Sequence, residues 1–440
     1  MASQGSMGDD LEELTGGLRR MWSTASLGSK LGMKAASRVL FSKKGETPDP
    51  DDALASSEAA IAAAKKLVAK MGKLKGLAMK AGQIASYMPG ALPPAAQEVL
   101  AELQASSTPM SFARIDEVLV AELGNRGRDL FDSIDERPFA AASIGQVHRA
   151  TLDGAPVAVK VQYPGVEGAI RNDLRMVAVI ARLSTVGSPL DGRGLAAELR
   201  DRLLEECDYT RESEHQRLFA RLLSTVDGAN VPAVIDARSS RRVLTSTFAS
   251  SGPLTAIADQ PTRDRAGQII FRACFELLFR RCIYNADPHP GNYLVDADGG
   301  VTFLDFGCVR RFEPDMIRTW KRMALAILDG DRTGFQTGFR ALGFVGKEKK
   351  FDWDYQWNAM RTLYKPFLEP GYRHVAADVT RSFGVLMFDN PNRMRLVVPP
   401  EWLFLNRLQW GLNAVLAQLG AVGPWGATIR ELLASELEPA

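Results

Sequence analysis

Three polar residues in the C-terminal half of the chain have the types and the spacing that phosphoryl transfer requires. Asp287 and Asn292 fit the pattern D-x-x-x-x-N, and Asp305 begins the tripeptide D-F-G after one strand-like run. In such a set the first Asp positions or deprotonates the acceptor, while the Asn and the second Asp hold Mg²⁺. The metal is needed because the transferred group carries dense negative charge. The three residues therefore predict Mg²⁺-dependent phosphoryl transfer.

The order of these motifs carries more weight than D-F-G alone, because Asp-Phe-Gly also suits a turn at the end of a strand. Residues 301–304 form a short apolar run, which is typical of a buried strand that would deliver Asp305 to the site. Together with the earlier D-x-x-x-x-N, this run indicates a catalytic loop followed by a metal-binding segment.

Farther upstream, Lys160 ends the β-branched segment 157–160, Val-Ala-Val-Lys. Alternation along a strand projects this lysine from one face, where it can reach the α- and β-phosphates of a nucleotide. The segment matches the strand motif V-A-I-K with one conservative change. A lysine on a surface strand would be the commoner interpretation if the tetrapeptide stood alone.

The segment just before this strand predicts a loop that covers phosphates. Residues 140–147 align with G-x-G-x-x-G-x-V, with alanine at the first two glycine positions. Each alanine adds a methyl group and restricts the backbone, so we expect a stiffer loop. Alanine-rich runs favour helix, but Pro138 and Gly145 favour strand, loop and strand here. The expected nucleotide-binding residues are Ala140, Ala141, Ala142, Ser143, Ile144, Gly145, Val147 and Lys160.

When two further motifs are added to those above, the chain resembles the UbiB-type (AarF/Coq) atypical kinase family. This is a protein-kinase-like group linked to ubiquinone and isoprenoid-lipid metabolism. K-x-G-Q occurs at residues 80–83, and E-x-D occurs at residues 206–208, followed by Arg211 and Glu212. These two, the alanine-rich loop and the segment 286–292 follow one another in family order, which makes a chance match very unlikely.

The resemblance implies roles for individual residues. Glu212 resembles the helix glutamate that pairs with Lys160 and orients it, and its position after E-x-D distinguishes it from the other glutamates of the segment. The implied catalytic residues are Asp287, Lys160 and Glu212. The implied Mg²⁺ ligands are Asn292 and Asp305, and the implied nucleotide is ATP.

The same resemblance implies a regulatory lid. In the family the K-x-G-Q segment folds across the kinase cleft and meets the E-x-D carboxylates, so we expect Lys80 and Gln83 to lie near Glu206 and Asp208. Such a lid would hinder a protein substrate. Without the resemblance, a surface helix with an exposed lysine and glutamine would be preferred.

The segment after D-F-G argues against a peptide acceptor. No A-P-E motif follows Asp305, and residues 308–314 lead quickly into a helical pattern. Little room is left for an activation segment or a peptide platform. A small acceptor, a lipid head group or water therefore fits the sequence better than a peptide.

Composition limits the kinds of binding partner and the cellular location that we expect. The net charge of +2 and the pI near 8.3, with no basic and aromatic stripe, predict no nucleic-acid partner. No apolar run approaches the roughly 20 residues that span a bilayer. Four cysteines without metal-site spacing predict reduced thiols. We expect a cytoplasmic protein with no transmembrane segment.

The N-terminal region suggests contact with a membrane surface. Residues 11–44 combine apolar side chains with several lysines and arginines, a mixture suited to an interfacial amphipathic helix. A disordered tail and a helix docked on the kinase body are equally compatible alternatives. Residues 45–52 predict a flexible acidic linker.

The sequence predicts an α+β chain with a bilobal, protein-kinase-like fold. The small lobe is expected to hold an antiparallel sheet with inserted helices, the large lobe to be helical, and a helical N-terminal extension to cross the cleft. The predicted domains are a tail with a linker at 1–55, the K-x-G-Q extension at 56–135, the small lobe at 136–247 and the large lobe at 248–440.

Two functions from different classes fit these observations. The first is an ATP- and Mg²⁺-dependent atypical kinase or ATPase that acts on, or is stimulated by, isoprenoid or quinone-precursor lipids. The alternative is a nucleotide-binding pseudokinase scaffold for a lipid-biosynthetic complex, which the alanines at 140 and 142 and the lid keep open. A conventional protein kinase is disfavoured because A-P-E is missing.

Overall fold

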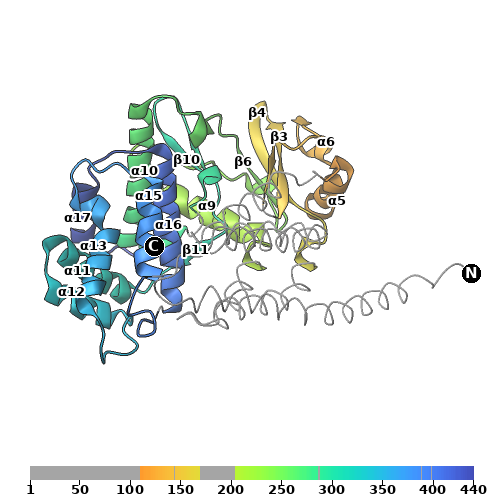
Figure 1. Ribbon diagram of the computed structural model, residues 1–440. Coiled ribbons are helices and arrows are strands. Elements are labelled where there is room, and N and C mark those ends of the chain that lie inside the picture. The colour runs from red at the N-terminus through yellow and green to blue at the C-terminus, as the bar shows by residue number, and fades with distance from the viewer. Residues whose placement is uncertain (1–109, 143, 169–203, 286–287, 388, 398) are drawn as a thin grey trace, which may run out of the picture. The chain divides into compact units, whose positions relative to one another are not determined.

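The computed structural model describes residues 110–142, 144–168, 204–285, 288–387, 389–397 and 399–440, which all belong to one compact unit (Figure 1). Several predictions concern residues outside these ranges. They are the amphipathic segment at 11–44, the linker at 45–52, and residues Lys80, Gln83, Ser143 and Asp287.

A five-stranded antiparallel sheet forms the small lobe. The main order is β1-β3-β4-β6, and β2 pairs with β3 on the same side as β1. This arrangement confirms the predicted α+β class and its antiparallel sheet. The strands are β1 (Ser133–Ile134), β2 (Ala140–Ala141), β3 (Gly145–Leu152), β4 (Ala155–Gln162) and β6 (Val243–Thr247).

A tight hairpin joins β3 and β4. Asp153 and Gly154 connect the strands with φ angles of 51° and 75°, the two positive values that a type I′ turn requires. Because a two-residue turn sets the register, Lys160 on β4 lies opposite Val147 of β3 and Leu244 of β6. Lys160 therefore lies on a central strand of the sheet. Pairing with β3 on one side and β6 on the other fixes the register of β4 and with it the position of the lysine.

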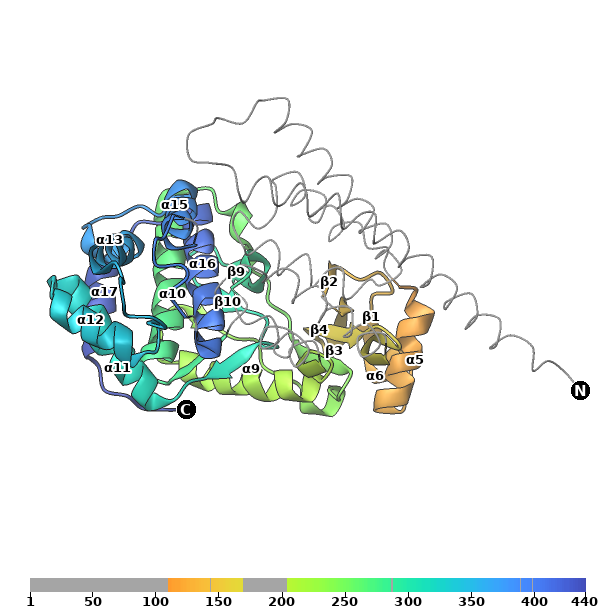
Figure 2. The same ribbon diagram turned by 60° about the horizontal axis from the view of Figure 1, so that its bottom comes forward.

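Two helices that precede the sheet in the sequence pack against it (Figure 2). They are α5 (Phe112–Leu123) and α6 (Gly127–Leu130). Ile115 and Leu119 of α5 are fully buried against the β4 valines, including Val159, in one hydrophobic cluster. The four-residue spacing of these α5 side chains places them on one helix face, which is why the helix can lie flat on the sheet.

Helix α9 (Tyr209–Leu223) joins two hydrophobic cores. At its first turn, Tyr209 packs in a small cluster with Ile144 of the small lobe. Near its end, Phe219 belongs to the large-lobe core. The helix begins at Asp208, whose side chain accepts a hydrogen bond from the Thr210 backbone N–H at 3.0 Å. This is an N-cap, which satisfies an amide that has no partner inside the helix.

Two smaller sheets carry the segments in which the catalytic motifs lie. One has the order β5-β10-β9-β7, with β10 parallel to β5 and antiparallel to β9, and the other pairs β8 with β11. The strands are β5 (Ala229–Asn230), β7 (Gly252–Pro253), β8 (Ile283–Asn285), β9 (Tyr293–Val295), β10 (Val301–Phe303) and β11 (Val309–Arg311).

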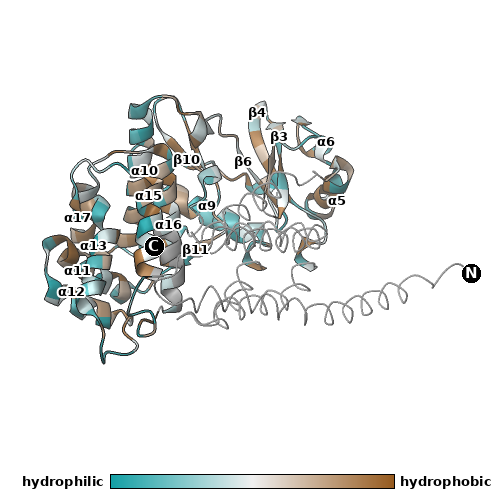
Figure 3. Ribbon diagram, viewed as in Figure 1, coloured by the Kyte–Doolittle hydropathy of each residue, from teal (hydrophilic) through white to brown (hydrophobic). Residues whose placement is uncertain are grey.

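Helices make up most of the large lobe, as predicted. Both hydrophobic and hydrophilic residues occur along them (Figure 3), and many of the hydrophobic residues form the core of this lobe. The α-helices are α10 (Gln260–Phe279), α11 (Pro314–Asp329), α12 (Arg332–Ala341), α13 (Trp353–Leu363), α14 (Lys365–Leu368), α15 (Ala376–Met387), α16 (Pro400–Leu419) and α17 (Trp425–Ala434). Short 3₁₀ turns are η1 (Asp236–Arg238), η2 (Leu254–Ala256) and η3 (Pro290–Asn292).

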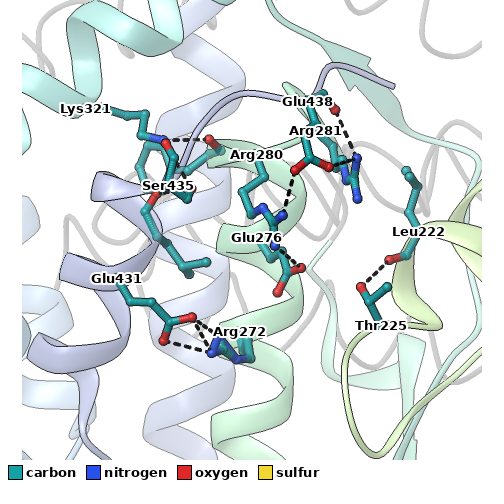
Figure 4. Close-up of polar contacts among 12 residues, drawn as sticks. Leu222, Thr225, Arg272, Glu276, Arg280, Arg281, Lys321, Glu431, Ser435 and Glu438 are labelled. Atoms are coloured by element: carbon teal, nitrogen blue, oxygen red, sulfur yellow. Dashed lines mark hydrogen bonds and ion pairs between the residues drawn. The ribbon is translucent and has the colours of Figure 1, made fainter.

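Polar contacts tie α17 and the residues after it to α10 and α11 (Figure 4). Lys321 of α11 is buried and donates to the Phe279 carbonyl at 3.0 Å. Glu438 accepts from Arg280 at 2.9 Å and pairs with Arg281 at 2.6 Å. These contacts hold the end of α10, from which the chain runs directly into β8 and toward the predicted catalytic loop.

Candidate active site

Three elements bring together a lysine and two carboxylates that the sequence singled out. Lys160 of β4 donates a hydrogen bond to Oε1 of Glu212 on α9 at 2.7 Å. Its Nζ is also 3.7 Å from Oδ2 of Asp305, which follows β10. The Glu212 side chain is only 4% exposed, whereas that of Asp305 is 33% exposed. One carboxylate is thus reserved for orienting the lysine, and the other remains accessible to a ligand.

The electrostatics of this cluster follow from burial. Burial raises the pKa of Glu212 to about 7, Lys160 opposes that shift, and the Asp305 carboxylate adds to it. Burial alone would lower the pKa of Lys160, but the carboxylates of Glu212 and Asp305 outweigh it and hold the pKa well above its usual range. Lys160 is therefore a permanent cation, the form that attracts phosphate oxygens.

Tyr209 forms one wall of the lysine site, and the sequence analysis assigned it no role. The Lys160 Nζ lies 4.9 Å from the centroid of the Tyr209 ring, within the range of a cation–π contact. The phenol is 1% exposed, and its hydroxyl has no hydrogen-bond partner among the described residues. Its position three residues before Glu212 was the available signal, because such residues share a helix face.

The pairing of β9 with β10 places Asn292 beside the D-F-G segment. Asn292 immediately precedes β9, and its carbonyl accepts from the Leu304 backbone N–H at 3.0 Å. Asp305 is the next residue, and its Oδ1 accepts from the Gly307 backbone N–H at 2.9 Å. The Asp305 carbonyl accepts from the Asn285 side chain at the end of β8. Asn292 and the D-F-G motif therefore meet at one end of the β9–β10 hairpin.

This donor set fits a magnesium ion. Mg²⁺ takes oxygen ligands, commonly one or two from protein side chains with the remainder from water and phosphates. Asp305 can supply a carboxylate and Asn292 an amide oxygen. Within the described ranges, His, Cys, Asp and Glu form no group of three or more suited to a metal ion.

Helix α9 also holds the D-F-G phenylalanine. Phe306 is fully buried, and its ring centroid lies 5.1 Å from that of Phe219. His215 donates from Nδ1 to the Phe306 carbonyl at 3.2 Å. Burial lowers the pKa of His215, so the ring is neutral at neutral pH. No local sequence pattern links His215 to residue 306, so its role is visible only in the fold.

The alanine-rich segment forms strand, loop and strand, as expected. Ala140 and Ala141 make up β2, opposite Val147 and Gln146 of β3. The Ala142 backbone N–H donates to the Gly145 carbonyl at 2.9 Å, which closes a short turn. Ala140, Ala141, Ala142 and Val147 therefore lie at the tip of the β2–β3 hairpin, and their contact with a nucleotide stays a prediction.

Two residues of this predicted loop serve packing. Ile144 is 1% exposed, and its side chain belongs to the cluster around Tyr209 and not to the surface of the loop. At Gly145, a Cβ would lie 2.2 Å from the Val161 carbonyl oxygen, so only glycine fits this approach of β3 to β4. This requirement for glycine concerns strand spacing, whereas the sequence alignment related it to a bound phosphate.

The E-x-D residues separate into different environments. Glu206 lies near D-F-G, since a Cβ on Gly307 would be 3.8 Å from its Cγ, and its charge helps to raise the pKa of Glu212. Asp208 caps α9 instead. Because Lys80 and Gln83 lie outside the described residues, their pairing with these carboxylates remains a prediction. The same holds for the role of Asp287, although both of its flanking segments, β8 and η3, are described.

Together the fold and the lysine, glutamate and aspartate cluster define a protein-kinase-like class of protein. Residues 102–338 match the family described as ABC1 atypical kinase-like domain. The chain belongs to this family, which confirms the resemblance and the predicted kinase-like fold.

Named relatives agree. The chain is 35% identical to the mitochondrial atypical kinase COQ8B of Rattus norvegicus, over 81% of this chain and 69% of the relative. It is 29% identical to the mitochondrial atypical kinase COQ8 of Saccharomyces cerevisiae, over 96% and 85% of the two chains. The solved structure of Rv3197 from Mycobacterium tuberculosis, in complex with erythromycin, is similar with a TM-score of 0.63 and 27% identity, covering 89% of this chain and all of that one. None of the helices described for this chain is long and apolar enough to span a bilayer.

Proposed function

We propose that this chain is an ATP- and Mg²⁺-dependent atypical kinase or ATPase. The observation that carries the proposal is the 2.7 Å pair between Lys160 and Glu212 beside the accessible carboxylate of Asp305. A lysine oriented by a helix glutamate, next to a metal-binding aspartate, is the arrangement that active phosphotransferases of the kinase type require.

Each residue has a defined task in this proposal. Lys160 binds the α- and β-phosphates, and Glu212 keeps its ammonium group in place. Asn292 and Asp305 would hold Mg²⁺, which neutralises charge on the phosphates. Asp287 would position the acceptor or the attacking water and accept its proton. Tyr209 and His215 support the site by flanking Lys160 and by holding Phe306.

The acceptor is proposed to be a lipid, a small molecule or water. Between Asp305 and the start of α11 at Pro314, the chain forms only β11, which pairs with β8. This short connection supports the absence of a peptide platform. The resemblance further suggests a role in ubiquinone or other isoprenoid-lipid metabolism, with quinone precursors as ligands. The mixture of apolar and basic residues at 11–44 suggests peripheral membrane contact.

Mg²⁺-dependent binding of ATP tests this function. We expect Mg²⁺ and a non-hydrolysable ATP analogue to raise the melting temperature of the full-length protein, and the Asp305→Asn variant to lose the Mg²⁺-dependent part. Asp298→Asn, an exposed aspartate in the turn of the same β9–β10 hairpin, is the matched control and should respond like the wild type. An unchanged response of Asp305→Asn would refute the metal assignment.

ATP hydrolysis by the purified chain, with and without vesicles containing a quinone-precursor mimic, then separates enzyme from scaffold. Turnover that is lost in Asp287→Asn would be intrinsic. A scaffold that binds nucleotide is the second candidate, favoured by one observation: the Ala142 N–H bonds to Gly145 within the loop and is therefore occupied by the protein itself. Nucleotide binding without any turnover would support that candidate.

A further inference from the structure

We propose that Gly411 of α16 is a positioning residue, which sets the place of the catalytic loop through direct contact with Pro288. Pro288 follows Asp287 in the sequence, so any displacement of its ring acts on Asp287 through one peptide bond. The catalytic meaning of this contact rests on the proposed phosphoryl-transfer function.

The contact leaves no room for a side chain at position 411. A Cβ at Gly411 would lie 2.3 Å from Cγ of Pro288, 3.3 Å from its Cβ and 3.4 Å from its Cδ. Carbon atoms approach favourably at roughly 3.5–4.0 Å. Both residues are buried. Gly411 is not among the described glycines with positive φ, so space and not backbone conformation requires the glycine. A glycine inside a helix weakens it relative to alanine, which makes a packing reason for this residue more compelling.

The helix is the rigid partner in this contact. In the same segment of α16, the side chains of Leu412, Val415 and Leu416 are 1% exposed or less. Helix α16 also packs closely on α10, where a Cβ at Gly267 would lie 3.5 Å from Leu416. Moving α16 would disturb this core, whereas Pro288 and His289 belong to no helix or strand. An added methyl group would therefore displace the loop.

Displacement of Pro288 would reach the metal-binding side as well. The pyrrolidine ring is closed onto the backbone, so it cannot rotate away as a flexible side chain can. The next residue, His289, accepts at its carbonyl from the Asn292 N–H at 2.9 Å, and its Nδ1 accepts from the Gly291 N–H at 3.0 Å. These bonds make the loop a connected unit from Pro288 to Asn292.

Three variants of the full-length protein test the contact: Gly411→Ala, Pro288→Ala and the pair combined. Gly411→Ala should lower Mg²⁺-ATP turnover at least about tenfold, because misplacing a catalytic group by about 1 Å can cost a hundredfold. Pro288→Ala removes Cγ and Cδ, which leaves Cβ at 3.3 Å as the nearest ring atom. In that background Gly411→Ala should cost less than about threefold.

A second measurement does not depend on activity. Hydrogen–deuterium exchange of peptides covering residues 285–293, without nucleotide, should increase in Gly411→Ala relative to the wild type. Adding Gly411→Ala to Pro288→Ala should produce little further increase. The melting-temperature shift caused by the ATP analogue should change less than turnover does, because Lys160 and Asp305 do not contact position 411.

Two glycine substitutions serve as controls. Gly384→Ala, on α15, adds a Cβ with nothing within 4 Å, so it should leave turnover and loop exchange unchanged. Gly338→Ala, on α12, adds a Cβ 2.6 Å from Cβ of Met323, a similar clash between two helices. It should lower the melting temperature without raising exchange in residues 285–293.

Gly411→Ala turnover within twofold of wild type, or an equal loss with and without the Pro288 ring, would overturn the inference. The inference would also be overturned if Gly411→Ala and Gly338→Ala lost the same turnover per degree of lowered melting temperature. If the wild type hydrolyses no ATP, the proposed function fails and the contact loses its catalytic meaning, whatever the exchange data show. The inference is supported if Gly411→Ala loses turnover while Gly384→Ala does not, and if the loss becomes small in the Pro288→Ala background.

Discussion

At the scale of single residues, the pair of Lys160 and Glu212 decides what the site can bind. The Glu212 side chain is only 4% exposed, and Lys160, 2.7 Å away, opposes the rise in its pKa that burial causes. Removing one member of a buried pair leaves the other uncompensated, which is far costlier than losing an exposed pair. The lysine stays cationic, so the glutamate is the member whose ionisation responds to pH.

A pH dependence of turnover follows from this. Burial raises the pKa of Glu212 to about 7, so the carboxylate that orients Lys160 exists mainly above that pH. We expect turnover to fall between about pH 8 and about pH 6, as Glu212 takes up a proton and its attraction for Lys160 is lost. Glu212→Gln should be less active throughout and should lack this step in its pH profile. The exposed Glu214→Gln is the control, and an unchanged step in Glu212→Gln would contradict the assignment.

At the scale of elements, α9 connects the nucleotide-binding lobe with the D-F-G segment. One face of this helix presents Tyr209 and Glu212 to Lys160, and two turns farther Phe219 packs on Phe306. Since its two ends lie in different hydrophobic cores, a shift of α9 would move the lysine and the D-F-G backbone together. The helix is thus the element that fixes the positions of Lys160 and the D-F-G segment relative to each other.

His215 tests this role of α9. His215→Ala leaves the Phe306 carbonyl without its 3.2 Å donor, and we expect the unfolding free energy to fall by about 1–2 kcal/mol. Stabilisation by Mg²⁺ and the ATP analogue should weaken as well. His215→Asn places an amide N–H at a similar reach and should retain most of both. Equal losses in the two variants, measured by thermal and urea unfolding, would show that the hydrogen bond does not matter.

At the scale of the whole molecule, contacts between segments that are distant in sequence hold the large lobe together. Tyr372 and His374 precede α15. The His374 backbone N–H donates to the carbonyl of Ala421, which follows α16, at 3.1 Å. The His374 ring centroid lies 5.2 Å from that of Tyr372 and 5.1 Å from that of Trp425 on α17. This aromatic group joins α15, α16 and α17.

Acid should weaken the large lobe at this position. Burial lowers the pKa of His374 to about 4, from 6.5, and Asp378 only partly opposes the shift. The unfolded chain therefore binds the proton first, and stability is lost as pH falls from about 6.5 toward 4, by about 2 kcal/mol at pH 5. His374→Phe keeps the aromatic packing and should lose less between about pH 7.5 and pH 5. Parallel pH dependence of the two proteins in urea unfolding would disprove this.

Local patterns predicted the catalytic residue types and the strands that carry them. The Val-Ala-Val-Lys segment became β4, and the apolar run 301–304 includes β10, because alternation and short apolar runs are properties of neighbouring residues. Pairing of Lys160 with Glu212 was expected from the family resemblance, and the structure places them in direct contact. The alanine-rich loop formed the expected turn, but Ile144 lies inside the small-lobe cluster, since a motif does not show which way a side chain points.

The sequence by itself thus determined which family the chain resembles and the order of its motif segments, and it predicted the chemistry that we propose for Asp287, Asn292, Asp305 and Lys160. Only the tertiary structure decided what supports those residues. His215 on the Phe306 carbonyl and Gly411 against Pro288 join residues that no periodicity relates to the site, and helical spacing from Glu212 did not by itself place Tyr209 beside Lys160. Such contacts depend on how whole helices pack, which local sequence patterns do not encode.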